Sequence, residues 1–209
     1  MPAMLLGRRT PVTTIVLAAI AAMFVAETLL GGSENEGVLL RLGANYAPLV
    51  FQGQYWRLVS SMFLHIGFVH LLVNGWALYQ LGSLFELLMG SRRMLLVYFV
   101  SGTAGSIASL FFTGGLSAGA SGAIFGLMGA LIAFLLRHRE NLTPQAKSLL
   151  MQLLFWAGLN VFLGFNIPGI DNAAHLGGCA AGMLLGLALS RRPAEVRRRA
   201  LDGNNEGRP

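Results

Sequence analysis

The chain has 209 residues, of which 55% are hydrophobic and only 11% charged, with a formal net charge of +6. An ordinary soluble domain is about 25% charged, so the composition excludes that class and indicates a membrane protein. The basic residues stand in short clusters between apolar runs, which argues against a nucleic-acid-binding surface.

Six apolar runs follow one another along the chain, at residues 12–30, 58–89, 94–112, 121–136, 149–165 and 173–189. A helix needs about 20 apolar residues to cross roughly 30 Å of hydrocarbon. Backbone groups in lipid must be paired within their own segment, so the runs are predicted as helices. The first run is longer than the apolar part of a cleavable signal peptide, about 7–15 residues, which disfavours that alternative. The predicted fold is an all-α polytopic membrane bundle of six transmembrane helices over residues 1–190.

Basic residues predict the orientation of these helices. Thirteen of the fifteen lie before the first run, on alternate connections, or after the sixth run. Only Arg41 and Arg57 lie on the other side. We therefore expect a multi-pass membrane protein with both termini in the cytoplasm and residues 31–57 outside. The membrane is expected to be a bacterial inner membrane. Residues 191–209 would form a basic, disordered cytoplasmic tail.

Three of the runs carry polar residues that are costly inside a bilayer and are therefore functional candidates. The second run contains "LHIGFVHLLVN", with His65, His70 and Asn74. Ser121 begins the fourth run within "GASGAIFG", and His175 begins the sixth within "DNAAHLGG". The question is whether these side chains meet.

Spacing from the cytoplasmic arginines predicts that they do. Ser121 lies 16 residues before Arg137, and His175 lies 16 residues before Arg191. At 1.5 Å per residue each is about 24 Å from its arginine, so both occupy one depth, from which the site would open to the outer side.

The second run reaches the same layer. Asn74 lies 18 residues before Arg92, which is roughly 27 Å, and His70 is one turn higher. Because His70 and Asn74 are four residues apart, they share a helix face.

Small residues predict that the fourth and sixth helices pack closely. Gly178, Gly182 and Gly186 repeat every fourth residue in the sixth run, and the fourth run repeats Gly122, Gly126 and Ala130. Stripes of this kind let two backbones approach each other in lipid. The close approach would bring His175 towards Ser121.

The chemistry of such a layer is that of acyl transfer. A serine hydroxyl becomes a nucleophile when a base takes its proton, and His175 can be that base. No carboxylate is spaced to orient the histidine, since Asp171 falls in a predicted loop, so we interpret the pair as a Ser–His dyad. The oxyanion needs hydrogen-bond donors, which His70, Asn74 and the Ser121 N–H can supply.

Each residue also has a structural interpretation. Ser121 alone would more often be a packing residue, and His65 is interpreted as an interfacial polar residue. Glu86 is expected to accept structural hydrogen bonds within the membrane. Cys179 is expected to be a small apolar residue, because nothing in the sequence near it favours a thiolate. No carboxylate or thiolate joins the histidines at zinc spacing, so neither a metal nor another cofactor is expected.

Taken together, these motifs resemble the rhomboid family of intramembrane serine proteases over most of the chain. The GxSG motif of that family is matched by Gly119, Ser121 and Gly122. The resemblance also covers the histidine and small-residue repeat of the sixth apolar run, and the histidine–asparagine pair and buried glutamate of the second. It further covers the Trp–Arg pair of the first external segment. These are matched by His175, Gly178, Gly182, His70, Asn74, Trp56, Arg57 and Glu86. Phe125 stands where some members have a tyrosine, so stacking on the histidine is kept and the hydroxyl is lost.

The resemblance implies cleavage of single-pass membrane proteins in or near their transmembrane segment. It implies transmembrane proteins and the lipid bilayer as partners, and it leaves the oligomeric state open. Phe155 and Trp156 would belong to a lateral substrate gate. Two alternatives stay open: a catalytically inactive rhomboid-fold protein that binds membrane proteins for quality control, and a small transporter. The inactive class would typically lack the serine or the histidine, and a transporter would more often show repeats.

Overall fold

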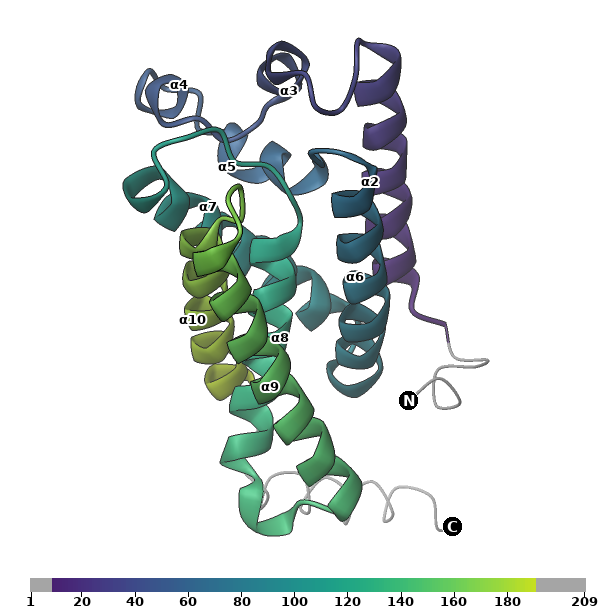
Figure 1. The fold of residues 1–209 in the computed structure, drawn as a ribbon. Helices are drawn as coiled ribbons and strands as arrows, with labels where there is room; N and C mark the ends of the chain where they lie inside the picture. Colours follow the sequence, from purple (N-terminus) through teal and green to yellow (C-terminus); the bar gives the residue numbers. More distant parts are fainter. Residues whose placement is uncertain (1–8, 191–209) are drawn as a thin grey trace.

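The computed structural model describes residues 9–190, which form a bundle of long helices with most of the short helices at one end (Figure 1). The predicted tail, 191–209, lies outside the described residues. Among residues 9–190 the only β pairing is an isolated bridge between Asn45 and Ser117. The long helices are α2 (Pro11–Leu29), α6 (Phe68–Met89), α7 (Ser91–Phe112), α8 (Ser121–Arg137), α9 (Pro144–Asn166) and α10 (Asn172–Leu189). The short ones are α3 (Glu36–Leu42), α4 (Ala47–Phe51), α5 (Arg57–Ser60), η1 (Ser61–Phe63) and η2 (Arg139–Asn141).

The lengths of these helices fit an all-α polytopic membrane fold, as predicted. In the described part of the chain, α2, α7, α9 and α10 are each long and apolar enough to cross a membrane. α8, with 17 residues, is shorter. The remaining long helix, α6, passes the same test together with the short helices before it, as a bent pair.

The second apolar run is broken, which corrects the expectation of one long helix over 58–89. Residues Arg57–Phe63 and Phe68–Met89 meet at an angle of 94°. Gly67 has φ +83°, a left-handed conformation that favours glycine, and the His65 N–H donates to the Glu27 carboxylate of α2 at 3.0 Å. His65 therefore lies in the break, ahead of α6. Its side chain is fully buried, so the interfacial interpretation was wrong.

The fifth helix begins earlier than its apolar run. α9 starts at Pro144, and the Thr143 hydroxyl accepts the Ala146 N–H as an N-cap. Proline is well suited to the first helical position because it has no N–H to leave unpaired. Lys147 thus lies in the first turn of α9 and not in the connection before it.

α8 is the central helix, since α6, α7, α9 and α10 all pack against it (Figure 1). Most of its side chains are buried, which fits a helix that is apolar on all sides. A second contact joins α2 to α6 through Glu86. This buried carboxylate accepts the N–H groups of Val12 and Thr13 and the hydroxyls of Thr13 and Ser91, at 2.6–3.0 Å. The structural role expected for Glu86 is confirmed.

The glycine stripes of α8 and α10 face each other as predicted. A β-carbon added at Gly178 or Gly182 would overlap the carbonyl oxygen of Gly122 or Gly126, respectively. At Gly186 it would lie 2.5 Å from the Ala130 carbonyl oxygen. The two backbones are therefore in direct contact, and this contact sets the separation of the residues that begin α8 and α10.

We expect Gly182→Ala to lower the unfolding temperature in detergent, because its added methyl group meets the rigid backbone of α8. Overpacking of this kind costs about 1–3 kcal/mol. Gly158→Ala is the matched control, since a β-carbon there has nothing within 4 Å, and it should leave the unfolding temperature unchanged. Equal unfolding temperatures for the two variants would contradict the close α8–α10 contact.

Candidate active site

The loop that precedes Ser121 is hydrogen-bonded to three neighbouring segments. Its Ser117 exchanges two main-chain hydrogen bonds with Asn45, at 2.9 and 2.8 Å, and the Gly119 N–H donates to the Ser61 carbonyl at 2.9 Å. The Ser117 hydroxyl donates to Asp171 at the start of α10, at 2.7 Å. Ser121 follows as the first residue of α8, so the serine is held by elements from across the chain.

Gly119 places His70 beside the serine. Its φ of +145° favours glycine. A β-carbon at this position would lie 2.8 Å from Cε1 of His70 and 3.8 Å from Oγ of Ser121. The His70 ring and the Ser121 hydroxyl therefore border the same small space, and the first glycine of the GxSG motif keeps that space open.

His175 is held against α8 one turn beyond the serine. Its ring stacks on Phe125, with ring centroids 4.3 Å apart and an interplanar angle of 5°. The preceding residue also approaches α8, since a β-carbon on Gly122 would lie 3.3 Å from the Ala174 carbonyl oxygen. The predicted stacking contact is confirmed, and it brings the start of α10 against the start of α8.

No hydrogen bond joins Ser121 and His175 among the described residues. His175 is 7% exposed and its Nδ1 is buried without a partner in residues 9–190, whereas Ser121 is half-buried. Catalytic hydrogen bonds are often long in a free enzyme and tighten when substrate binds. The arrangement is therefore compatible with a dyad that closes on its substrate.

Asn74 lies one turn below His70 on α6 and is 5% exposed. Its Nδ2 donates to the His70 carbonyl oxygen at 3.0 Å. An amide nitrogen carries two hydrogens, so one N–H remains for another acceptor. His70 of α6 lies beside the start of α8, and His175 of α10 stacks on α8, so the three helices bring polar residues together here. Their common depth in the membrane stays a prediction.

The comparisons with known proteins agree with this geometry. The family model described as the Rhomboid domain matches residues 52–192. The chain belongs to the rhomboid family. It is 38% identical over 177 residues to the Rhomboid protease GluP of Bacillus subtilis, covering 85% of this chain and 34% of the relative. It is 39% identical over 158 residues to RHOMBOID-like protein 5 of Arabidopsis thaliana, covering 74% of this chain and 50% of the relative.

A further rhomboid relative is the Rhomboid-like protease 1 of Toxoplasma gondii, 35% identical over 164 residues. That match covers 74% of this chain and 54% of the relative. The chain thus spans about a third to a half of the length of these relatives. Family membership and the apolar helices together make this protein a multi-pass integral membrane protein.

The contacts of Asp171 were not predicted. It caps α10 by accepting the Ala174 N–H at 2.9 Å, and it also accepts the hydroxyls of Ser109, Thr113 and Ser117 at 2.5–2.7 Å. Burial acts to raise the pKa of this carboxyl, but the four hydrogen bonds outweigh burial and hold the pKa below its ordinary value of 3.8. The carboxylate therefore stabilises the fold above that pH and loses this contribution as the pH falls through the lowered pKa.

The Trp–Arg pair organises the segment between α2 and α6. Nη1 of Arg57 donates to the carbonyl oxygens of Leu40 and Ala44, at 2.8 and 3.0 Å, and the guanidinium lies 4.8 Å from the centroid of the Trp56 ring. Arg57 is buried. These contacts connect α5 to the end of α3, so the pair has a structural function in this rhomboid domain.

Phe155 and Trp156 lie on the outer side of α9. They are 63% and 50% exposed and pack edge-to-face on each other, with centroids 5.6 Å apart. Leu153 is the one buried residue of α9. Both aromatic side chains are therefore directed away from the core of the bundle.

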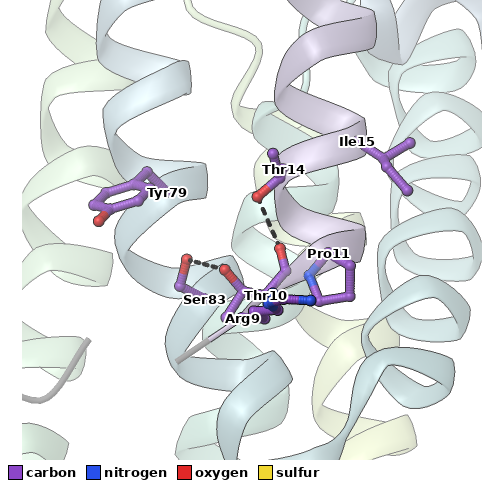
Figure 2. Close-up of a pocket in the computed structure, with 7 residues that line it drawn as sticks. All are labelled: Arg9, Thr10, Pro11, Thr14, Ile15, Tyr79 and Ser83. Atoms are coloured by element: carbon purple, nitrogen blue, oxygen red, sulfur yellow. Dashed lines mark hydrogen bonds between the residues drawn. The ribbon is translucent and has the colours of Figure 1, made fainter. Parts of the chain in front are cut away.

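A cavity of about 440 Å³ lies between the start of α2 and α6 (Figure 2). Its lining includes Arg9, Thr14, Tyr79 and Ser83, and the hydroxyls of Thr10 and Ser83 are 3.3 Å apart there. None of the candidate catalytic residues lines it. In the described residues no group of three or more His, Cys, Asp or Glu is arranged to hold a metal ion.

We expect Phe125→Ala to lower the rate of any reaction that uses His175 as a base, because the imidazole loses the ring on which it stacks. Phe125→Tyr should be tolerated, since it keeps the stacked ring. The rate of substrate cleavage by the two purified variants measures this effect. Wild-type activity in Phe125→Ala would show that stacking does not orient the histidine.

Proposed function

We propose that this rhomboid protein is an intramembrane serine endopeptidase that cleaves single-pass membrane proteins in or near their transmembrane segment. The observation that supports it most strongly is the convergence of three polar side chains from separate helices. His70 of α6 borders the same space as the Ser121 hydroxyl of α8, and His175 of α10 stacks on Phe125 one turn away. The bacterial relative, a Rhomboid protease, and the parasite relative, a Rhomboid-like protease, support the same activity.

In the proposed reaction, Oγ of Ser121 attacks the carbonyl carbon of the scissile peptide bond while His175 takes the hydroxyl proton. The tetrahedral intermediate collapses when His175 returns that proton to the leaving amine, which leaves an ester on Ser121. Water then attacks the ester with His175 again as base, and the serine is regenerated. The stacked Phe125 keeps the imidazole in one orientation through both steps.

The oxyanion of this intermediate needs donors that are in place before the reaction. The Ser121 N–H lies in the first turn of α8, where main-chain N–H groups have no helical partner. The His70 ring lies beside Oγ of Ser121, and Asn74 keeps one amide N–H for another acceptor. We assign these three groups to the oxyanion site.

Substrate is proposed to enter from the bilayer past α9, where Phe155 and Trp156 are exposed. A transmembrane segment moving between α9 and the rest of the bundle would displace few buried side chains, because Leu153 is the buried residue of that helix. The partners of the protein would then be membrane proteins and lipid.

The test is labelling with a serine-directed fluorophosphonate, comparing the wild type with Ser121→Ala in the purified protein. Labelling of the wild type alone supports an activated serine. Absence of labelling in a folded wild type would favour the inactive rhomboid-fold alternative, in which the same pocket binds membrane proteins without cleaving them.

We also propose that both termini face the cytoplasm, because thirteen of fifteen basic residues fall on that side of the predicted topology. Alkaline phosphatase fused after residue 209 should then be inactive, since that enzyme works only outside the cytoplasm. A fluorescent protein fused at the same position should be bright. The reverse pattern would contradict the assigned orientation.

A further inference from the structure

A buried carboxylate of α2 contacts the break ahead of α6. Glu27 is 0% exposed, and its Oε1 accepts the His65 N–H at 3.0 Å. An acid inside a membrane helix is costly and is found where it has a function. Glu27 precedes the segment that matches the family model, which begins at residue 52.

Three polar atoms at this contact need a further partner. Oε2 of Glu27 and both ring nitrogens of His65 are buried, and none of them has a hydrogen-bond partner among residues 9–190. The Phe63 main chain also interacts with the His65 ring, but outside hydrogen-bond geometry. Buried polar atoms are nearly always satisfied by protein or by ordered water, and a buried water typically makes about three hydrogen bonds to such atoms.

The same histidine leads directly to the proposed catalytic layer. The His65 ring packs edge-on against the His70 ring, with centroids 5.2 Å apart and an interplanar angle of 60°. The His70 ring in turn lies beside Gly119 and Oγ of Ser121. The orientation of His65 therefore limits the positions that the His70 ring can take.

We propose that Glu27 and His65 form a buried site that binds ordered water, and that through this site Glu27 is a positioning residue for His70. The water donates to Oε2 of Glu27 and bonds one ring nitrogen of His65. The other oxygen of Glu27 holds the His65 main chain. The positioning function rests on the proposed protease activity, whereas the water site does not.

The first test is a crystal structure of the wild-type protein grown from lipid, at a resolution that shows ordered water. We expect density within hydrogen-bond distance of both Oε2 of Glu27 and a ring nitrogen of His65. Direct bonding of the carboxylate to the ring, or a dry contact, would overturn the water site whether or not the protein is a protease.

The second test compares kcat and KM for cleavage of a single-pass membrane substrate in liposomes. Glu27→Leu should lower kcat about tenfold or more, because small displacements of a catalytic group are costly, and should leave KM within about twofold. Glu27→Gln keeps an acceptor for the His65 N–H and a polar group for the water, so it should restore most of the rate.

Glu86→Gln is the matched control. Glu86 also accepts main-chain N–H groups across the α2–α6 contact, but at the opposite end of α2. Its variant should lower the unfolding temperature and leave the kcat of the folded protein unchanged. If Glu27→Leu does not fold, His65→Phe replaces it, because phenylalanine keeps a ring and loses both nitrogens. This variant should show the same fall in kcat with KM little changed.

A wild-type kcat in Glu27→Leu, or in His65→Phe where that substitute is used, would overturn the positioning function. Equal losses of kcat in Glu27→Leu and Glu86→Gln would also overturn it, because the effect would then be general destabilisation. The wild type and Ser121→Ala are measured alongside. If neither the wild type nor Ser121→Ala cleaves the substrate, or if both do, the proposed protease function is contradicted. The crystallographic test of the water site is unaffected by that result.

Discussion

Ser121→Ala, His175→Ala and the double variant are expected to reduce cleavage of a membrane substrate to one common background. If the serine and the histidine act as one chemical unit, removing either abolishes the step that both perform. Effects within such a unit are strongly non-additive. The measurement is the initial rate with purified protein in liposomes, with substrate in excess.

All three variants should still fold, because each change removes a polar group that has no hydrogen bond to lose within residues 9–190. Unfolding temperatures close to that of the wild type would establish this. Residual cleavage by purified Ser121→Ala would refute the serine mechanism. A double variant slower than both single variants would show that the two residues act independently.

Asn74→Ala is expected to lower kcat by about 10²–10³ with little change in KM, because an oxyanion donor acts mainly in the transition state. His70→Ala should resemble it, since the His70 ring lies beside the serine hydroxyl. Both variants should remain measurably active, in contrast to the loss expected for Ser121→Ala.

Asn166→Ala is a suitable control for Asn74→Ala. The Nδ2 of Asn166 also donates to the carbonyl oxygen four residues earlier, that of Phe162, at 2.7 Å, but from the exposed end of α9. Losing this local hydrogen bond should not change kcat. A normal rate in Asn74→Ala would remove that residue from the oxyanion site, and an equal loss in Asn166→Ala would assign the effect to the helix and not to the reaction.

Some features of the site required the tertiary structure. The 94° break before α6 contains a hydrogen bond from His65 to Glu27, which lies 38 residues earlier. Asp171 collects hydroxyls from residues 54–62 positions away. An apolar run contains no information about which distant acid will satisfy a given N–H group. One signal was available, because Glu27 is a lone acid in the first apolar run and intramembrane acids are costly.

The sequence by itself determined the helices and the pairing of α8 with α10. Lipid offers no hydrogen bonds to the backbone, so long apolar runs had to become helices, and repeated glycines indicated where two backbones could meet. The contact of Gly122 with Gly178 follows from that pattern. Only the tertiary structure decided how the ends of the helices join, which buried His65 and placed His70 beside Gly119. Those positions result from hydrogen bonds between segments distant in the chain, and such bonds leave no periodic trace in the sequence.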